Sequence, residues 1–259
     1  MTAKTDTSTD VIKELFSVGA HLGYRKARRH PSMKRYVYGV KDNQEIINLE
    51  HTKQSIEDAQ AFLKDIAAKG GMIQFLGGKK ESQEAVERVA KEVAMPYVLG
   101  RWIGGTFTNF AQIRRQVDKL IRLRDEREKG DLEKYTKREQ LTFDREIVDL
   151  EKFYGGMTEL TKLPSVLVVI DPTQEQIAVD EALHVGVPIV ALANTDCNIS
   201  EVDHAIPCND HSKSTINLII GLLGDAIKEG QAQAAENNPK ANADEGEKAP
   251  AKRHKVAAA

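Results

Sequence analysis

The segment from 163 to 198 constrains the fold of this chain more than any other. It contains an uninterrupted run of β-branched and aliphatic residues, Val166 to Ile170, with no polar alternation. Such a run is typical of a strand covered on both faces, as in a parallel sheet. A helical pattern follows between Pro172 and Gly186, and a second aliphatic run extends from Ile189 to Leu192. Strand, helix and strand together predict a βαβ unit with parallel strands.

The same alternation of strand and helix patterns occurs on both sides of this unit. The further strand patterns lie at 72–76, 96–99 and 205–206, and the further helical patterns at 51–69, 81–94 and 214–229. A hairpin of two short strands is expected earlier, across Asp42 and Asn43. The repeated order predicts an α/β protein with an open, mostly parallel sheet.

The alternation is interrupted at 109–154, where two strongly charged helical segments occur. Each segment carries one narrow apolar stripe, formed by Ile113, Val117 and Leu120 in the first and by Phe143, Ile147, Leu150 and Tyr154 in the second. Narrow stripes on charged helices predict an antiparallel helical hairpin. We expect this hairpin to project from the sheet as a rod. The alternative is a solvated helix pair that packs flat on the domain.

The sequence therefore divides into three parts. The α/β globular domain comprises 1–108 and 155–230, the inserted helical hairpin comprises 109–154, and a tail comprises 231–259. The tail is rich in Ala, Glu, Asn, Lys and Pro and has almost no large apolar side chain, so it is expected to be disordered. No run approaches the ~18 apolar residues of a membrane span, and the first residues lack the apolar core of a secretory signal.

The strongest functional signal is the basic segment, which we define as residues 24–41. Its seven basic residues are Arg25, Lys26, Arg28, Arg29, Lys34, Arg35 and Lys41, and it has no acidic residue. In a chain whose formal net charge is only −2, such a cluster predicts an anionic partner. Arginines suit phosphate groups, and the interleaved Tyr24, Tyr36 and Tyr38 suit stacking on unpaired bases. The alternative is a solvated basic loop.

A second basic and aromatic segment lies where the sheet domain meets the hairpin. It runs from Arg101 and Trp102 through GGTFTNF to Arg114 and Arg115. Neither segment shows a base-reading code, so contacts to the nucleic-acid backbone and shape are expected. We expect the basic segment to lie beside the hairpin, so that both dock on one polyanion.

Signals for catalysis are weak. The turn from Gly77 to Lys80 follows a strand and precedes a helix, where backbone N–H groups hold anions, but it lacks the rest of a phosphate loop. A tight turn with exposed lysines is the favoured interpretation, and contact with the phosphate of a larger ligand stays compatible with it. Asp171 ends a strand at the usual ligand edge of open α/β sheets, although Pro172 after it favours helix capping. A small-molecule enzyme that uses this turn and Asp171 is the rival hypothesis.

No metal or other cofactor is expected. His204, Asp210 and His211 are close in sequence but lack metal-ligand spacing, so they are interpreted as surface loop residues. The two cysteines, Cys197 and Cys208, form no metal-spaced pair and fit a reduced cytosol.

Several longer motifs occur together along residues 9–228. They are GAHLGY, RRHPSMKRYVYG, IINLEHT, FLGGKK, RWIGGTFTNF, LPSVLVVIDP, HVGVPIVALANTDCN and AIPCNDHS. In these motifs, and in their order, the chain resembles the universal small-subunit ribosomal protein S2 family. The resemblance implies a flavodoxin-like α/β domain with a protruding coiled-coil hairpin and a non-enzymatic role in the small ribosomal subunit. It also implies cytoplasmic, ribosome-associated contacts with 16S rRNA and neighbouring proteins, including ribosomal protein S1 where that protein is present.

The chain departs from the family pattern at a few positions. Tyr24 stands where a second histidine is common, His30 stands where asparagine is common, and Asn198 and Ile199 replace a usual Asp-Pro. Relatives with that histidine and aspartate could chelate a metal, and this chain is not expected to do so.

We therefore interpret the chain as an rRNA-binding structural protein that acts by charge neutralisation and shape fit. The primary predicted contacts with rRNA phosphates are Arg25, Lys26, Arg28, Arg29, Lys34, Arg35 and Arg101. The secondary predicted contacts are Lys79, Lys80, Arg114 and Arg115.

Overall fold

The centre of the protein is a five-stranded sheet with the strand order β5-β4-β6-β7-β8. The structure is a computed structural model that describes residues 5–237, with side chains from 10 to 236. The strands are β4 (Ile73–Gly77), β5 (Tyr97–Leu99), β6 (Val166–Ile170), β7 (Ile189–Ala193) and β8 (His204–Pro207). Every neighbouring pair is parallel. This order confirms the predicted flavodoxin-like α/β fold.

The aliphatic runs form the central strands of this sheet. Every residue of β4, β6 and β7 is buried. Because side chains alternate along a strand, Val168 and Ile170 join the core on one face, and Leu167 and Val169 join the core on the other. Both faces are covered, which explains the absence of polar alternation in the sequence.

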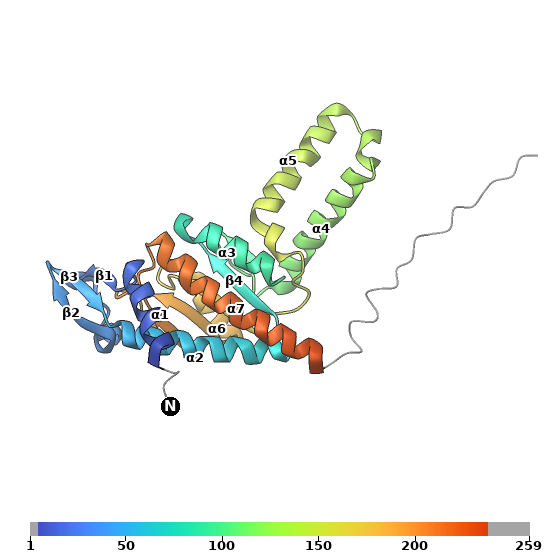
Figure 1. Cartoon of the computed structure of the whole chain (residues 1–259). Helices are drawn as coiled ribbons and strands as arrows, with labels where there is room; N and C mark the ends of the chain where they lie inside the picture. Colours follow the sequence, from blue (N-terminus) through green and yellow to red (C-terminus); the bar gives the residue numbers. More distant parts are fainter. Residues whose placement is uncertain (1–4, 238–259) are drawn as a thin grey trace, which may run out of the picture.

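Helices cover the two faces unequally (Figure 1). One face carries α1 (Thr5–Ser17), α2 (Leu49–Ala68), α3 (Lys80–Glu92) and α7 (Lys213–Asn237). The opposite face carries α6 (Gln176–Val185), whose Ala178 and Ala182 pack under the sheet. Helix α7 continues beyond residue 230, so the predicted tail begins too early, and its remaining residues, 238–259, lie outside the described part.

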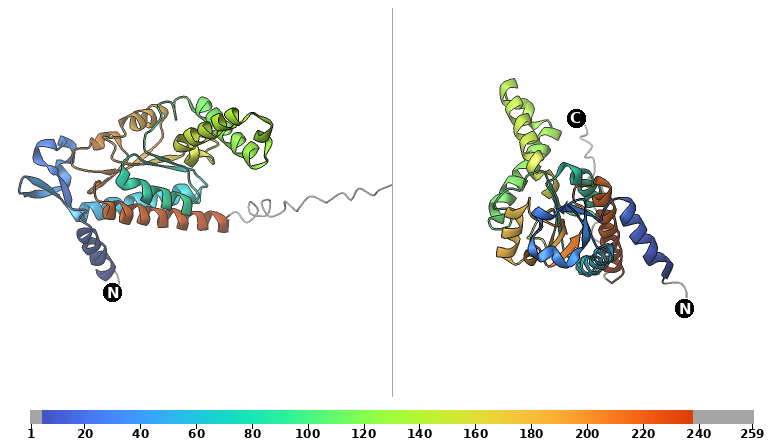
Figure 2. Two further views of the ribbon diagram at one scale, coloured as in Figure 1. Left: turned by 90° about the horizontal axis from the view of Figure 1, so that it is seen from above. Right: turned by 90° about the vertical axis from the view of Figure 1, so that its left-hand side faces the viewer.

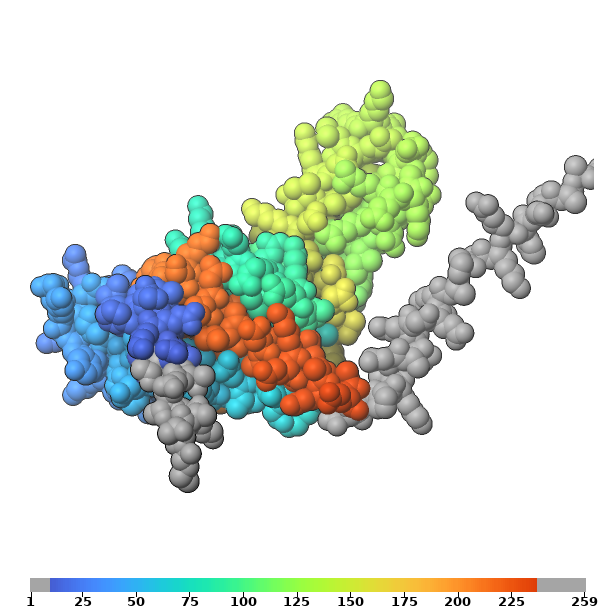
Figure 3. Space-filling model, in the orientation of Figure 1, coloured from blue at the N-terminus to red at the C-terminus, as the bar shows by residue number. Residues whose placement is uncertain are grey.

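The inserted segment forms two antiparallel helices, α4 (Phe110–Glu128) and α5 (Lys137–Tyr154), joined through η3 (Asp131–Lys134). Their seam buries Leu120, Leu123 and Ile147. Ion pairs flank the seam, between Lys119 and Glu146, Arg124 and Glu151, and Arg127 and Asp144. The pair projects from the sheet (Figures 1 and 3), which confirms the protruding hairpin over the flat alternative.

A small antiparallel sheet with the order β1-β3-β2 forms the N-terminal end of the body. Its strands are β1 (Leu22–Arg25), β2 (Val37–Lys41) and β3 (Gln44–Ile47). Asp42 and Asn43 join β2 to β3 with φ values of 50° and 64°, as a tight hairpin turn requires. The small sheet and the helical hairpin lie at opposite ends of the molecule (Figures 1 and 2). Within residues 5–237, each helix is too short or too polar to cross a lipid bilayer.

Candidate nucleic-acid interface

The basic segment is built into the small sheet instead of forming a loose loop. Between β1 and β2 it makes two 3₁₀ turns, η1 (Lys26–Arg28) and η2 (Pro31–Tyr36). Proline suits the first position of η2 because its fixed φ matches the turn, and the Ser32 N–H donates to His30 Nδ1 at the same end. Met33 is fully buried against Cys197 and Ile199, which anchors the turn on the main domain. The segment therefore presents its charges on an ordered surface.

Six of the seven basic side chains of the segment are exposed. They are Arg25, Lys26, Arg28, Lys34, Arg35 and Lys41. None of the six pairs with a carboxylate in the part of the chain that the structure describes. The surface at this end of the body therefore keeps an unneutralised positive potential, which attracts polyanions.

Two of the three tyrosines already hold an arginine from the same segment. The Arg28 guanidinium lies 4.6 Å from the centre of the Tyr24 ring, and that of Arg35 lies 4.8 Å from the centre of the Tyr36 ring. These cation–π contacts cover one face of each ring. Tyr38 is 80% exposed, so its ring is the most accessible of the three for stacking on an unpaired base.

Arg29 differs from its neighbours because it has a carboxylate partner. Its Nη1 lies 3.1 Å from Oε1 of Glu45, whose side chain is completely buried on β3. Both Glu45 oxygens lack a hydrogen bond in the described structure, so this ion pair is their compensation. Arg29 is therefore needed by the small sheet, which disfavours its predicted contact with an rRNA phosphate, because moving it would leave a buried charge without compensation.

The second segment is held by a residue that the sequence analysis missed. Glu181 on α6 accepts hydrogen bonds from the N–H groups of Gly105 at 2.5 Å, Phe107 at 2.8 Å and Thr108 at 3.3 Å. The Trp102 ring packs edge-on against Phe107, with 5.0 Å between the ring centres. The only sequence signal for Glu181 is its place beside alanines on the buried face of a helix.

The arginines of this segment have separate roles. Arg101 and Arg115 are exposed and remain available to a partner. Arg114 pairs with Asp118 at 2.8 Å and donates to the carbonyl oxygens of Thr158 and Leu160 at 3.2 and 3.0 Å. Arg114 therefore fastens the root of the hairpin to the domain, and its prediction as an rRNA contact is not supported by its position.

The two lysines after β4 also lie in different environments. Lys80 is exposed at the start of α3, as predicted. Lys79 is buried, with its Nζ 2.7 Å from Asp171 and 2.5 Å from Asp210. Burial opposes its charge, but the two carboxylates outweigh burial and raise the pKa of Lys79. The expectation of an exposed Lys79 is wrong, and its burial between two carboxylates disfavours the predicted contact with a phosphate.

The surroundings of Lys79 form a polar network at the carboxyl edge of the sheet. Asn194 donates to Asp210 at 2.7 Å, and the Tyr24 hydroxyl contacts His211. Burial, followed by the charge of Asp210, raises the pKa of Tyr24 to about 12, so the phenol stays protonated. The network therefore connects the small sheet to the main domain.

The other residues that were considered as catalytic or metal-binding candidates have structural roles. Asp171 accepts hydrogen bonds from the N–H groups of Thr173 and Gln174, besides its pairing with Lys79. Asp210 is fully buried, so its prediction as a surface loop residue is wrong. His204 packs on Phe62. No group of three potential metal ligands comes together among the described residues.

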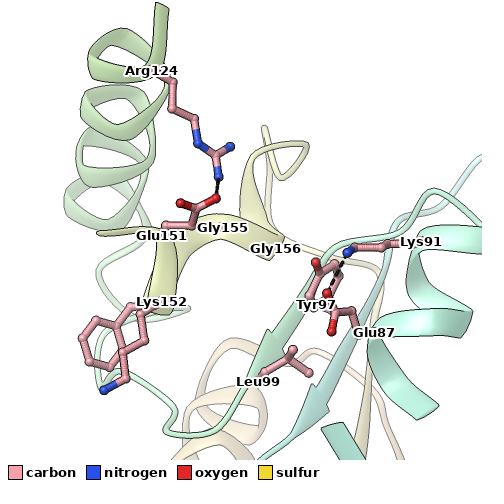
Figure 4. A pocket seen from close by; sticks show the side chains of 10 residues that line it. Glu87, Lys91, Tyr97, Leu99, Arg124, Glu151, Lys152, Gly155 and Gly156 are labelled. Carbon is pink, nitrogen blue, oxygen red and sulfur yellow. Dashed lines mark hydrogen bonds and ion pairs between the residues drawn. The ribbon is translucent and has the colours of Figure 1, made fainter. Parts of the chain in front are cut away.

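A hollow of about 450 Å³ lies where the hairpin joins the domain (Figure 4). Of the three cations that line it, two are neutralised, because Lys91 pairs with Glu87 at 2.6 Å and Arg124 pairs with Glu151, while Lys152 lies over the ring of Phe153. A Cβ at Gly156 would collide with the backbone oxygen of Tyr97, so a side chain there would displace the hairpin root. This hollow is therefore a feature of the hairpin's attachment to the domain.

The resulting surface has two separate cationic areas. The basic surface, defined as Arg25, Lys26, Arg28, Lys34, Arg35 and Lys41, occupies the small sheet. Arg101 and Arg115 belong to the segment that leads from β5 into the hairpin. The expectation that the basic segment lies beside the hairpin is wrong.

Comparison with known proteins gives a consistent result. The sequence model of the family described as "Ribosomal protein S2" matches residues 15–230. Proteins from three strains of Dehalococcoides mccartyi, each described as "Small ribosomal subunit protein uS2", are 40% identical over 223 residues. The alignments cover 86% of this chain and 91% of each relative.

Proposed function

This chain belongs to the ribosomal protein S2 family, and we propose that it binds the 16S rRNA backbone and neighbouring proteins within the small ribosomal subunit. Members of the family are structural, non-enzymatic components of that subunit. The enzyme hypothesis is therefore wrong, and the burial of Lys79 between two carboxylates removes its phosphate-binding group. The working location is the ribosome in the cytoplasm.

The single observation that carries rRNA binding is the basic surface on the small sheet. Its six cations are exposed, and none of them has a carboxylate partner in the described structure. Phosphates that lie against it would release condensed counterions, which favours binding without any base-specific contact. Arg101, Arg115 and Lys80 form a second, weaker set of candidate phosphate contacts.

The hairpin supplies a surface of a different kind. On α5, Arg138, Leu141, Arg145, Val148 and Lys152 recur at helical spacing and share the side that faces away from the seam. Leu141 is 51% exposed and Val148 is 63% exposed. The three cations have no ion pair among the described residues, because the nearby carboxylates of Asp144, Glu146 and Glu151 bind cations of α4.

This stripe on α5 fits a neighbouring protein of the small subunit better than it fits rRNA. Exposed aliphatic side chains gain free energy only against apolar atoms, which a sugar–phosphate backbone does not offer in a continuous row. Flanking cations select a partner segment with acidic side chains. Ribosomal protein S1 is included among the candidate neighbours on the family resemblance alone.

Sedimentation tests the proposal. The full chain, expressed with a tag in a bacterium, should sediment with small subunits, and Arg28→Glu should lower its share in that fraction several-fold. Lys162→Glu is the matched control, because Lys162 is exposed and lies outside both cationic areas. If the wild-type chain stays in the supernatant, the subunit assignment fails. If Arg28→Glu is incorporated like Lys162→Glu, the basic surface is not the rRNA contact.

A further inference from the structure

A second pocket lies at the carboxyl ends of the sheet strands. It has a volume of about 400 Å³ and is lined by Gly78, Gly100, Arg101, Trp102, Gln174, Glu175 and Ile177. These residues follow β4, β5 and β6. In the order β5-β4-β6-β7-β8, connections run to opposite sides from the gap between β4 and β6, and such switch points are where open α/β sheets bind ligands.

The pocket contains an acceptor without a donor. Glu175 is only 7% exposed, and no side chain or backbone N–H in the described structure donates to its carboxylate. Burial, and then the charge of Asp171, raises the pKa of Glu175 to about 7. The carboxylate lies so close to the Gly78 Cα that a Cβ there would overlap Glu175 Oε1. Glycine at 78 therefore makes room for a carboxylate that has no partner within the protein.

The pocket also contains a donor without an acceptor. The indole Nε1 of Trp102 is buried and has no hydrogen-bond partner in the described structure. Buried polar groups in folded proteins are nearly always paired, and an unpaired one requires a specific explanation. This unpaired donor and the Glu175 carboxylate line one pocket, next to the exposed cation of Arg101, and together they point to a ligand that pairs with both.

Guanine has the hydrogen-bonding edge that complements this pair. Its N1–H and N2–H donate side by side, which suits a carboxylate, and its adjacent O6 accepts, which suits an indole N–H. Adenine and cytosine present a single amino group beside an acceptor nitrogen, and uracil presents one N–H between two acceptors, so each would set an acceptor against the carboxylate. An arginine from a protein would also satisfy Glu175, but the charge of Arg101 disfavours it and suits a phosphate.

We propose that this pocket receives one unpaired guanine of the rRNA, with Glu175 accepting from its N1–H and N2–H, Trp102 donating to O6, and Arg101 contacting the adjoining phosphate. Recognition of unstacked bases by their hydrogen-bonding edges is the usual way in which proteins identify positions in RNA. The inference rests on the proposed rRNA partner and adds one base-specific contact to it.

Chemical probing of assembled small subunits tests this inference. Kethoxal reacts with guanine at N1 and N2, the two positions that Glu175 would cover. Subunits containing the wild-type chain should protect one guanine, and Glu175→Gln should raise the reactivity of that guanine about tenfold. Asp180→Asn is the matched control, because it removes the same charge from an exposed position on α6 and should leave protection intact.

A second variant covers the case in which Glu175→Gln fails to enter the subunit. Trp102→Phe removes the indole N–H and should expose the same guanine. The inference is overturned if no guanine changes in either variant, if the two variants expose different guanines, or if dimethyl sulfate reports an adenine instead. Because these variants are measured in subunits that contain the chain, such a result would leave the proposed function standing.

Discussion

Arg29 and Glu45 form an ion pair of 3.1 Å in which the carboxylate is completely buried and the arginine is about one-quarter exposed. Arg28 is adjacent in sequence and exposed, and instead lies over the ring of Tyr24. Two neighbouring arginines of one basic segment therefore have opposite tasks, since one stabilises the small sheet and the other faces solvent.

Arg29→Ala should lower the free energy of unfolding by on the order of 3 kcal/mol, because it leaves the Glu45 carboxylate buried without compensation. Chemical denaturation measures the loss. Arg28→Ala is the control and should change stability by less than about 0.5 kcal/mol. Pairing Arg29→Ala with Glu45→Gln should recover most of the loss, and equal effects of the two single variants would refute the distinction.

Lys79→Ala should lower the free energy of unfolding, and it should not remove a direct contact with RNA. The substitution leaves Asp171 and Asp210 buried without a cation, at a cost of about 3–5 kcal/mol. Lys80→Ala is the matched control, since its side chain is exposed and its loss should leave the unfolding free energy unchanged. Thermal unfolding compares the two variants. A stable Lys79→Ala protein would show that the pair with Asp210 contributes little.

Glu175 should make the protein less stable as the pH rises. Its pKa increases from an ordinary 4.5 to about 7 in the folded state, so the folded state holds the proton more tightly than the unfolded state. The advantage is complete below pH 4.5 and disappears as the pH rises through 7, a change of about 3 kcal/mol at most. Glu175→Gln should raise the melting temperature at pH 8 relative to wild type and have little effect at pH 5.

The same melting curves have a second use. If Glu175→Gln stabilises the isolated chain, the carboxylate is costly to the fold, which agrees with a role in binding. An unchanged difference between the two proteins from pH 5 to pH 8 would show that Glu175 is already paired or solvated in the folded state.

Binding to 16S rRNA should depend strongly on salt. The logarithm of affinity should fall linearly with the logarithm of salt concentration, by roughly 0.7–0.9 for each phosphate that the protein neutralises. Arg28→Ala should reduce this slope by about one contact, whereas Arg114→Ala should not, because Arg114 binds backbone carbonyls of its own chain. Filter binding at several salt concentrations measures the slopes. A response that does not depend on salt would remove the electrostatic mechanism.

Val148→Asp should leave the hairpin folded and weaken its attachment to a neighbouring protein. Val148 is 63% exposed on α5, so its replacement should change stability by less than about 0.5 kcal/mol. Competition between wild-type and variant chains for incorporation into small subunits measures the effect. Thr142→Asp adds the same charge to the same helix outside the stripe and serves as control. Equal incorporation of both variants would exclude the stripe as a docking surface.

Local sequence patterns were sufficient for the architecture. The aliphatic runs in β6 and β7 predict buried parallel strands because a strand covered on both faces has no position for a polar side chain. The hairpin is also predictable from local sequence. Each charged helix has one narrow apolar stripe, and packing the two helices against each other buries both stripes. The strand β1 was missed because Leu22 to Arg25 carries no alternating pattern.

The candidate interface was predictable as a concentration of charge but not residue by residue. Arg25, Lys26 and Arg28 are exposed as expected, yet Arg29 is not free, and the basic surface lies at the end of the body away from the hairpin. Composition counts charges along the chain. It contains no information on which distant carboxylate approaches each charge once the strands pair.

What the sequence alone determined is the order of strands and helices apart from β1, the projecting helix pair and the presence of a strongly cationic segment, because each depends on neighbours within a few residues. What only the tertiary structure decided is the use of each charge. Lys79 meets Asp210, 131 residues further along the chain, only after β4 and the segment that follows β8 reach the same edge of the sheet. Lys79 loses its hydration at this edge and is stabilised by two carboxylates, whereas the side chain of Lys80, one residue later, stays exposed to water.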